Sequence, residues 1–408
     1  MRVKPFMAAS AAVLMCASAA EAATVRVTVA EYSSKTGPYF EEAASAFEAS
    51  NPDTDIVIEV VPWDVLLQKL TTDIAGNANA DIAIIGTRWL VDFVEQGIVT
   101  PLDDYMTDEF RGRFIETFLT PSVMDEQTYG LPIAASARAM YYNVDLLNGA
   151  GVAEPPATWD QVAEAARKIA DQDGEVYGYG LQGKEIETDV YYYYSLWSQG
   201  GDLLDEDGSS GLDSPEALAA LELYKRLIDE GLTQPGVTAY NREDVQNLFK
   251  QGKVGMMVTA PFLSGQIAAE APDLNYGVAP IPAGPDGDRG TYGVTDSIVL
   301  FDNSEVKDEA FAFLDFLFTR EQRVKFNTNE GFLPVLKSVA TDPVFADDRD
   351  LKVFAEILPT ARFAPVIAGW EEIAEVTSTA LQRVYLGEAT PEAGLQDAAA
   401  EADAILGK

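Results

Sequence analysis

Histidine is absent from the 408 residues, and cysteine occurs once, as Cys16. Without histidine the chain lacks the commonest metal ligand and general base, which excludes His-dependent catalytic triads and zinc sites of the usual kind. One cysteine cannot form a disulfide within the chain, so burial of apolar side chains has to hold the fold together. We therefore expect no metal site and no cofactor.

Basic residues are scarce: 28 lysines and arginines face 66 aspartates and glutamates, which gives a formal net charge of −38. Nucleic-acid binding needs a cationic face that displaces counterions from phosphates, so this composition excludes a nucleic-acid partner. A surface this acidic mainly promotes solubility.

Long apolar runs are also missing, apart from one short stretch near the N-terminus. Arg2 and Lys4 precede apolar residues 7–20, and Ala20-Glu21-Ala22 follows as a small-residue cleavage site. This pattern predicts a secretory signal peptide over residues 1–22, because the stretch is too short to span a bilayer. Cys16 lies inside it and follows Met15, which does not suit a lipid-attachment signal, so we expect a soluble exported protein without thiols.

The chain is too long for a single ordinary core, and a hydrophobic fraction of 47% indicates that it is globular throughout. Strand patterns at 25–29, 56–61 and 81–85 alternate with helical patterns that begin at Pro38 and at Leu66. Alternating strands and helices predict the α/β class, with a parallel sheet covered by helices and a ligand site beyond the carboxyl ends of the strands.

Aromatic and hydrogen-bonding residues follow each of these strands. Tyr32 follows the first, Trp63 and Asp64 the second, and Thr87-Arg88-Trp89 the third. Because the ends of parallel strands meet at one edge of a sheet, these loops together predict a binding site there. Trp63 can instead be a core or helix-start residue, and Arg88 a solvated charge.

A second candidate region is residues 129–143, which read as a backbone crossing between two domains. Pro132 suits the end of a strand, and the small residues around Ser136 allow backbone to approach a ligand closely. Arg138 stands isolated among small and apolar residues. We place Ser136 and Arg138 in a cleft, with a surface charge or an inter-domain ion pair as the alternative for Arg138.

Residues 129–143 resemble the first hinge crossing of the maltose-binding-protein-like solute-binding proteins of ABC importers, also called extracellular solute-binding protein family 1. Three further segments agree: Pro156-Ala157-Thr158-Trp159-Asp160 is similar to a helix start of the family, Gly200-Gly201 to its paired glycines, and residues 276–282 to its second crossing. The similarity runs from about Val25 to the C-terminus.

The resemblance implies a two-lobed periplasmic binding protein fold, in which each lobe is a mostly parallel sheet flanked by helices. Three hinge crossings are expected, near Ala134, Ala279 and Gly331. The N-terminal lobe then comprises residues 23–133 and 280–330, and the C-terminal lobe residues 134–279 and 331–408.

The resemblance also implies a function. The protein would capture a sugar or a sugar-like polyol in the cleft by hinge closure and deliver it to the permease subunits of an ABC importer. It would be a periplasmic monomer without enzyme activity that meets the membrane only through the permease. The absence of a Gly-x-x-x-x-Gly-Lys-[Ser/Thr] motif agrees, because the chain then carries no ATP site of that type.

Carbohydrate recognition needs flat apolar faces for the C–H surface of the sugar and polar groups for its hydroxyls. From the aromatic run 191–197 we expect one or two rings to face the cleft, and choose Tyr191 and Tyr192. Phe262 matches a loop that carries an aromatic ring in the family, with a core role as the alternative. The predicted ligand-binding residues are Tyr32, Trp63, Asp64, Thr87, Arg88, Trp89, Ser136, Arg138, Tyr191, Tyr192, Phe262, Tyr292, Gly293, Asp296 and Trp370.

The charge of the solute is left with two alternatives. Arg88 and Arg138 are expected on different lobes, so closure brings two guanidinium groups near one ligand, which is costly unless they are countered. If Asp64 and Asp296 supply the counter-charge, the solute is a neutral sugar or polyol, which we favour. If the solute supplies it, the protein binds an anionic sugar derivative such as a sugar acid, sulfonate or phosphate.

Two other classes of protein are alternatives. A glycoside hydrolase would use two carboxylates, but acidic residues are so abundant that some will lie near any cleft. A structural or adhesive surface protein would have neither a pocket nor a ligand. Ser136 and Arg138 also stand where the maltose binders carry a carboxylate and an aliphatic residue, so the resemblance gives no support for maltose itself as the solute.

Overall fold

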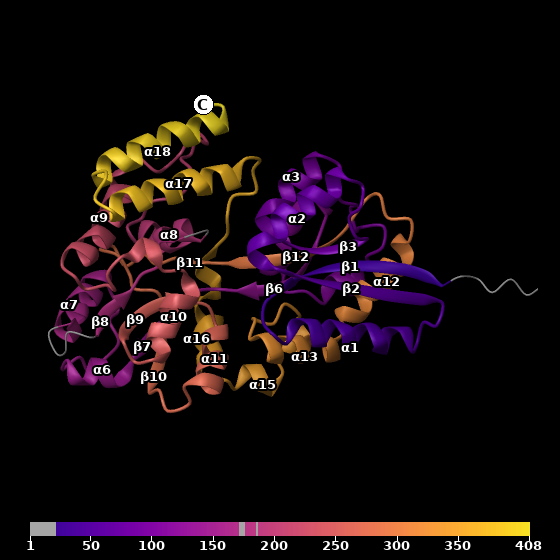
Figure 1. The fold of residues 1–408 in the computed structure, drawn as a ribbon, viewed down its shortest axis with the longest axis horizontal. Helices are drawn as coiled ribbons and strands as arrows, with labels where there is room; N and C mark the ends of the chain where they lie inside the picture. Colours follow the sequence, from indigo (N-terminus) through magenta and orange to yellow (C-terminus); the bar gives the residue numbers. More distant parts are fainter. Residues whose placement is uncertain (1–21, 171–175, 185–186) are drawn as a thin grey trace, which may run out of the picture.

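The computed structural model describes residues 22–170, 176–184 and 187–408. The predicted signal peptide lies outside them, apart from Ala22. The described chain forms two lobes side by side, each built around its own sheet (Figure 1). Among the helices of the described residues, none is long and apolar enough to cross a membrane.

The first lobe contains a five-stranded sheet in the order β2, β1, β3, β12, β6. Figure 1 shows α2 and α3 on one side of this sheet and α1 and α13 on the other. Its main elements are β1 (Ala23–Glu31), α1 (Thr36–Glu48), β2 (Thr54–Pro62), α2 (Trp63–Ala75), β3 (Ile82–Gly86), α3 (Leu90–Glu95), α4 (Asp108–Gly112), α5 (Glu116–Leu119), β4 (Val123–Met124), β5 (Gln127–Thr128), β6 (Leu131–Ser136), β12 (Val294–Leu300), α12 (Lys307–Leu317) and α13 (Arg320–Glu330).

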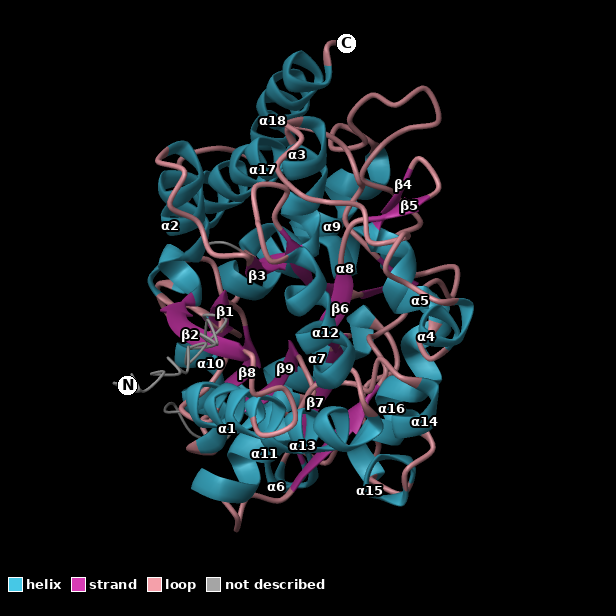
Figure 2. Cartoon of the chain, turned by 90° about the vertical axis from the view of Figure 1, so that its right-hand side faces the viewer, coloured by secondary structure: helices cyan, strands magenta, loops and turns pink. Residues whose placement is uncertain are grey.

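The second lobe contains a four-stranded sheet in the order β10, β7, β9, β8. In the turned view of Figure 2, helices surround the strands of both lobes. The elements of this lobe are β7 (Ala139–Asn143), α6 (Val144–Gly149), α7 (Trp159–Ala170), β8 (Tyr177–Gly180), α8 (Thr188–Ser198), α9 (Pro215–Asp229), α10 (Arg242–Lys250), β9 (Val254–Thr259), α11 (Phe262–Glu270), β10 (Tyr276–Ala279), β11 (Thr291–Tyr292), α16 (Arg349–Ile357), β13 (Ala361–Arg362), α17 (Trp370–Tyr385) and α18 (Pro391–Leu406).

The α/β class and the two-lobed fold are confirmed, but both sheets are mixed rather than mostly parallel. In the first lobe β1 is parallel to β2 and β3, whereas β12 is antiparallel to β3 and β6. In the four-stranded sheet of the second lobe only the β8–β9 pair is parallel. The reason is the connectivity: the chain leaves the first lobe along β6 and returns along β12, so these two strands must run in opposite directions.

Local sequence explains where two helices of the second lobe begin. Thr158 Oγ1 accepts a hydrogen bond from Gln161 N, which is one half of a capping box, while the Gln161 side chain accepts one from Ala157 N, the residue before the cap. Ser214 Oγ accepts from Ala217 N, and Pro215 occupies the first helical position of α9.

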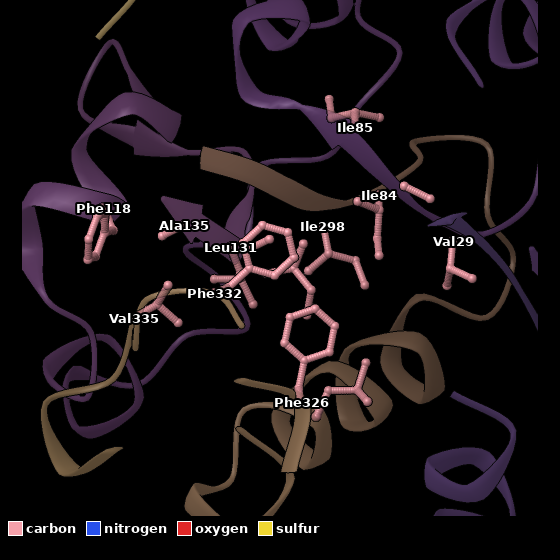
Figure 3. Close-up of a cluster of buried hydrophobic side chains, with 14 of the residues drawn as sticks. Val29, Ile84, Ile85, Phe118, Leu131, Ala135, Ile298, Phe326, Phe332 and Val335 are labelled. Atoms are coloured by element: carbon pink, nitrogen blue, oxygen red, sulfur yellow. The ribbon is translucent and has the colours of Figure 1, made fainter. Parts of the chain in front are cut away.

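An apolar core fixes the edge of the first lobe that faces the second. Strand residues Val29, Ile84 and Ile298 pack in one cluster with Phe326 of α13 and with Phe332, as Figure 3 shows. The rings of Phe326 and Phe332 are nearly parallel, with centroids 6.0 Å apart. This packing holds the ends of β1, β3 and β12 rigidly at the boundary between the lobes.

The second crossing differs from the expected position near Ala279. Residues 280–292 fold onto the second lobe, where Ala283 exchanges backbone hydrogen bonds with Ala157 and Trp159. Gly284 makes this possible, because a Cβ there would lie 1.6 Å from the Ser198 carbonyl oxygen. We therefore place this crossing at Gly293, immediately before β12.

We also propose a third crossing later than the predicted Gly331. Gly331 ends α13 with a φ of +76°, but the chain then runs back through the first lobe. Leu333 N donates to Ala135 O, and Val335 O accepts from Ile115 N. The chain crosses through α14 (Lys337–Ala340) and α15 (Pro343–Ala346) to α16, which packs against β10. We propose lobe boundaries at these points, with the first crossing between Ser136 and Ala139.

Candidate functional site

A cavity lies between the two lobes, at the edge of the first sheet where β1, β2 and β3 end. Its wall on the first lobe comes from the ends of β2 and β3 and from β12, and its wall on the second lobe comes from the start of α8 and from the segment after β13. It is lined by Trp63, Gly86, Thr87, Arg88, Trp89, Pro121, Glu187, Val190, Tyr292, Gly293, Val294, Thr295, Asp296, Phe363, Ala364 and Val366.

Three aromatic rings from three strand ends stack in a row on the first lobe. The ring of Trp63 lies 5.3 Å from Trp89 at an interplanar angle of 24°, and 6.1 Å from Tyr32 at 29°. Trp89 is buried, whereas Trp63 is partly exposed and lines the cavity. The row therefore places aromatic surface of Trp63 and Trp89 at the cavity. The predicted meeting of the strand ends is correct for these residues.

Asp296 lies on β12 and lines the same cavity. Its Oδ2 accepts a hydrogen bond of 2.8 Å from the hydroxyl of Tyr32. The pairing of β12 with β6 shifts register between Asp296 and Ser297. Burial raises the pKa of Asp296 to about 7, although the Tyr32 hydrogen bond acts in the opposite direction. Behind it, Ser297 Oγ lies 2.7 Å from Thr87 Oγ1.

Arg88 reaches across from the first lobe to two carboxylates of the second. Its Nη2 donates to Glu371 Oε2 at 2.8 Å, and its Nε lies 2.5 Å from Oε1. Its Nη1 lies 3.6 Å from Oδ2 of Asp189. Burial raises the pKa of Glu371 to about 6, and it also raises that of Asp189, while the charge of Arg88 lowers both.

Arg138 is buried between the lobes with only 2% of its surface exposed. Its Nη1 donates to Ser136 Oγ at 2.7 Å, and its Nη2 to Glu187 Oε1 at 3.3 Å. The other oxygen of Glu187 accepts from Arg242 Nη1 at 2.7 Å. Burial opposes ionisation of Glu187, but the charges of Arg242 and Arg138 outweigh it and lower the pKa of this carboxyl. Arg138 is thus an ion-paired residue of the crossing and does not line the cavity.

The cavity contains only some of the predicted residues. Asp64 is exposed at the start of α2, and Ser136 binds Arg138 instead of facing the cavity. Phe262 packs edge-on against Phe332 at 6.2 Å, where the lobes touch outside the cavity. The predicted residues that do line it are Trp63, Thr87, Arg88, Trp89, Tyr292, Gly293 and Asp296.

The aromatic rings of the second lobe are mostly core. Tyr192 donates from its hydroxyl to Ala217 O of α9, so the prediction that it faces the cleft is wrong. The argument that a ring of α8 must face outward fails because α9, α17 and β11 all pack around this helix. Tyr191 is also buried and does not line the cavity, and Trp370 packs near Tyr193 in the same core.

The site also contains residues that were not predicted from the sequence. Asp189 lies two positions before Tyr191, and Glu371 directly follows Trp370. Both therefore lie beside aromatic residues of the predicted site. Glu187 and Phe363 carry no pattern that marks them. Glu187 adopts a φ of +78°, which is uncommon for a residue with a side chain. Phe363 lies so close to Gly293 that a Cβ there would meet its ring at 2.5 Å. Within the described ranges, no group of three acidic side chains is placed to hold a metal ion.

This chain is similar to known solute-binding proteins. The family model of the bacterial extracellular solute-binding proteins matches residues 30–324. A protein of Brucella abortus (strain 2308), named only as a binding protein, is 65% identical over 405 residues, which cover 99% of this chain and 98% of that protein. The maltotriose-binding protein of Pyrococcus abyssi is 28% identical over 334 residues, which cover 80% of this chain and 70% of that protein.

Among solved structures, a solute-binding protein of an ABC transporter from Thermotoga lettingae, with α-D-tagatose bound, superimposes with a TM-score of 0.86. It is 26% identical, and the match covers 94% of this chain and all of that one.

Proposed function

The chain belongs to the bacterial extracellular solute-binding proteins, and we propose that it captures a sugar or a polyol in the cavity between its lobes for an ABC importer. The observation that supports this most is the pairing of the stacked Trp63 with the buried Asp296 in one cavity. A sugar or polyol offers a C–H face for the ring and hydroxyl donors for the carboxyl group.

The charges around the cavity favour a neutral solute. Arg88 is engaged by Glu371 and Asp189, and Arg138 by Glu187, so the protein itself supplies the counter-charge. These are not the carboxylates expected from the sequence, since Asp64 is exposed and Asp296 is bonded to Tyr32. An anionic solute would have to displace these partners and approach a protein with a net charge of −38.

We further propose that the protein acts as a periplasmic monomer without catalytic activity and meets the membrane through the permease. The N-terminal sequence pattern supports export, and the matching family model is that of bacterial extracellular solute-binding proteins. The tagatose-bound relative and the maltotriose-binding relative support a carbohydrate-like solute. Whether this solute is a monosaccharide or an oligosaccharide is tested by the panel below.

A thermal-shift panel tests the proposal. It contains D-tagatose, D-mannitol, ribitol, maltose and maltotriose as neutral solutes, and gluconate and glucuronate as anions. A ligand at about 100 times its Kd stabilises the folded protein by about 2.7 kcal/mol, which a melting curve resolves. A rise with a neutral member supports the proposal, and a rise with anions alone would replace it with an anion binder. Analysis of glycosides for turnover products tests the hydrolase alternative.

A further inference from the structure

We propose that Arg88, Glu371 and Asp189 form an inter-lobe latch that draws the two lobes together before any solute is bound. The inference rests on the proposed function, because it concerns the closure of the same cleft. It goes further in assigning Arg88 a second role: besides lining the cavity, it positions one lobe against the other.

The cation of the latch sits on a rigid support. Arg88 lies in the 3₁₀ turn Thr87–Trp89, which directly follows β3. Thr87 is tied to Ser297 of β12 through a contact of 2.7 Å between their hydroxyl oxygens, and Trp89 is stacked on Trp63. The guanidinium group therefore projects from a fixed edge of the first lobe.

The carboxylates of the latch are equally well placed on the second lobe. Glu371 lies in the first turn of α17 and Asp189 in the first turn of α8, and these two helices pack against each other. Acidic side chains are stabilised in the first turn of a helix, so both positions suit a carboxylate. Arg88 thus bridges two helix starts that form one rigid surface.

The shielding of the latch sets it apart from ordinary surface ion pairs. Arg88 binds Glu371 through two of its nitrogens, at 2.8 and 2.5 Å. The side chains of Arg88, Glu371 and Asp189 are 16%, 22% and 1% exposed, so water and salt screen them only in part. Opening the cleft would separate both carboxylates from this guanidinium group.

The chain offers a matched control within one lobe. Arg167 of α7 also binds a single carboxylate, that of Glu230, through two nitrogens at 2.5 and 3.0 Å. Both partners belong to the second lobe, so this pair cannot influence the angle between the lobes. Substitution of Arg167 removes one ion pair of this geometry and leaves the contacts of Arg88 unchanged.

Small-angle X-ray scattering of the purified protein without any solute tests the latch. Arg88→Gln and Glu371→Gln should each give a larger radius of gyration than the wild type, whereas Arg167→Gln should match the wild type. The charge-exchanged double variant Arg88→Glu/Glu371→Arg should return towards the wild-type value. Circular dichroism confirms that each variant is folded, and Glu371→Gln keeps the size of the side chain.

The latch is refuted if folded Arg88→Gln and Glu371→Gln scatter like the wild type. It is also refuted if the wild type is already as extended as these variants, or if the exchanged pair restores nothing. Because no solute is present, these outcomes are independent of the thermal-shift panel. Failure of the latch therefore leaves solute capture standing, and failure of the panel leaves the latch standing.

Discussion

The hydroxyl of Tyr32, at the end of β1, donates a hydrogen bond of 2.8 Å to Oδ2 of Asp296 on β12. The two residues are 264 positions apart in the chain, yet they meet at one edge of the first sheet. The bond ties the aromatic row to the acidic group of the cavity, so that Tyr32 and Asp296 hold each other in place.

Asp296 predicts a pH dependence of stability. Its pKa is about 7 in the folded protein, because it is buried, against about 3.9 for an unfolded aspartate. The folded state holds the proton more tightly, so the stability it contributes is complete below the unfolded pKa and is lost as the pH rises through about 7. Between about pH 5 and pH 6 the wild type should lose about 1.4 kcal/mol per pH unit relative to Asp296→Asn.

Chemical denaturation of both proteins across this range measures the difference. Tyr32→Phe provides a matched variant, because the tyrosine hydrogen bond lowers the pKa of Asp296. Without that bond the loss of stability should extend to higher pH. A difference between wild type and Asp296→Asn that stays constant from pH 5 to pH 8 would show that Asp296 does not hold its proton in this way.

Trp63 predicts a loss of affinity without a loss of fold. Trp63→Leu removes the ring that faces the cavity, so the Kd of a neutral solute should rise at least tenfold, which is about 1.4 kcal/mol. Tyr105→Leu is the control, because Tyr105 also stacks on a ring of the first lobe, Phe311, at 5.3 Å, but does not line the cavity. Calorimetric titration measures the Kd of the solute for both variants. If the two values are equal, Trp63 is not a ligand-binding residue.

Glu187 predicts a cost in stability. Glu187→Gln removes the carboxylate shared by Arg138 and Arg242 and leaves the buried Arg138 without its ion-pair partner. We expect a decrease of about 2 kcal/mol or more in the free energy of unfolding. Glu230→Gln breaks an exposed pair with Arg167 and should cost about 0.5 kcal/mol or less. If urea denaturation gives equal costs for the two variants, the shared ion pair does not support the crossing.

Gly293 predicts a steric limit at the second crossing. A Cβ on this residue would meet the Phe363 ring at 2.5 Å, so the ring has to move away from the cavity wall. Gly293→Ala should lower the free energy of unfolding by about 1–3 kcal/mol, the range for overpacking. The double variant Gly293→Ala/Phe363→Leu should recover part of the loss. If Gly293→Ala unfolds at the wild-type temperature, the contact is not restrictive.

The sequence was sufficient to predict the part of the site that lies at the strand ends of the first sheet. Tyr32, Trp63 and Trp89 follow three strands of a single βαβαβ pattern, and the ends of parallel strands necessarily meet. The position of such residues is set by local patterns and by the direction of the strands. Asp296 was predicted with the same strand-end set, as one of its hydrogen-bonding residues.

The remaining parts of the site depend on contacts between distant segments. Arg88 and Glu371 are 283 positions apart, and nothing in either neighbourhood indicates the other. Tyr192 was misplaced because α9 and α17 cover α8, a fact that only tertiary packing reveals. We propose a second crossing later than the predicted Ala279 because residues 280–292 fold back onto the second lobe.

Calorimetric titration of the purified protein with neutral sugars and polyols tests the account most directly. We predict one saturable site per chain for at least one neutral solute, weaker binding by Trp63→Leu, and recovery of the solute unchanged. If only anionic sugars bind, or if a glycoside is recovered as hydrolysis products, the account of a neutral-solute carrier is contradicted.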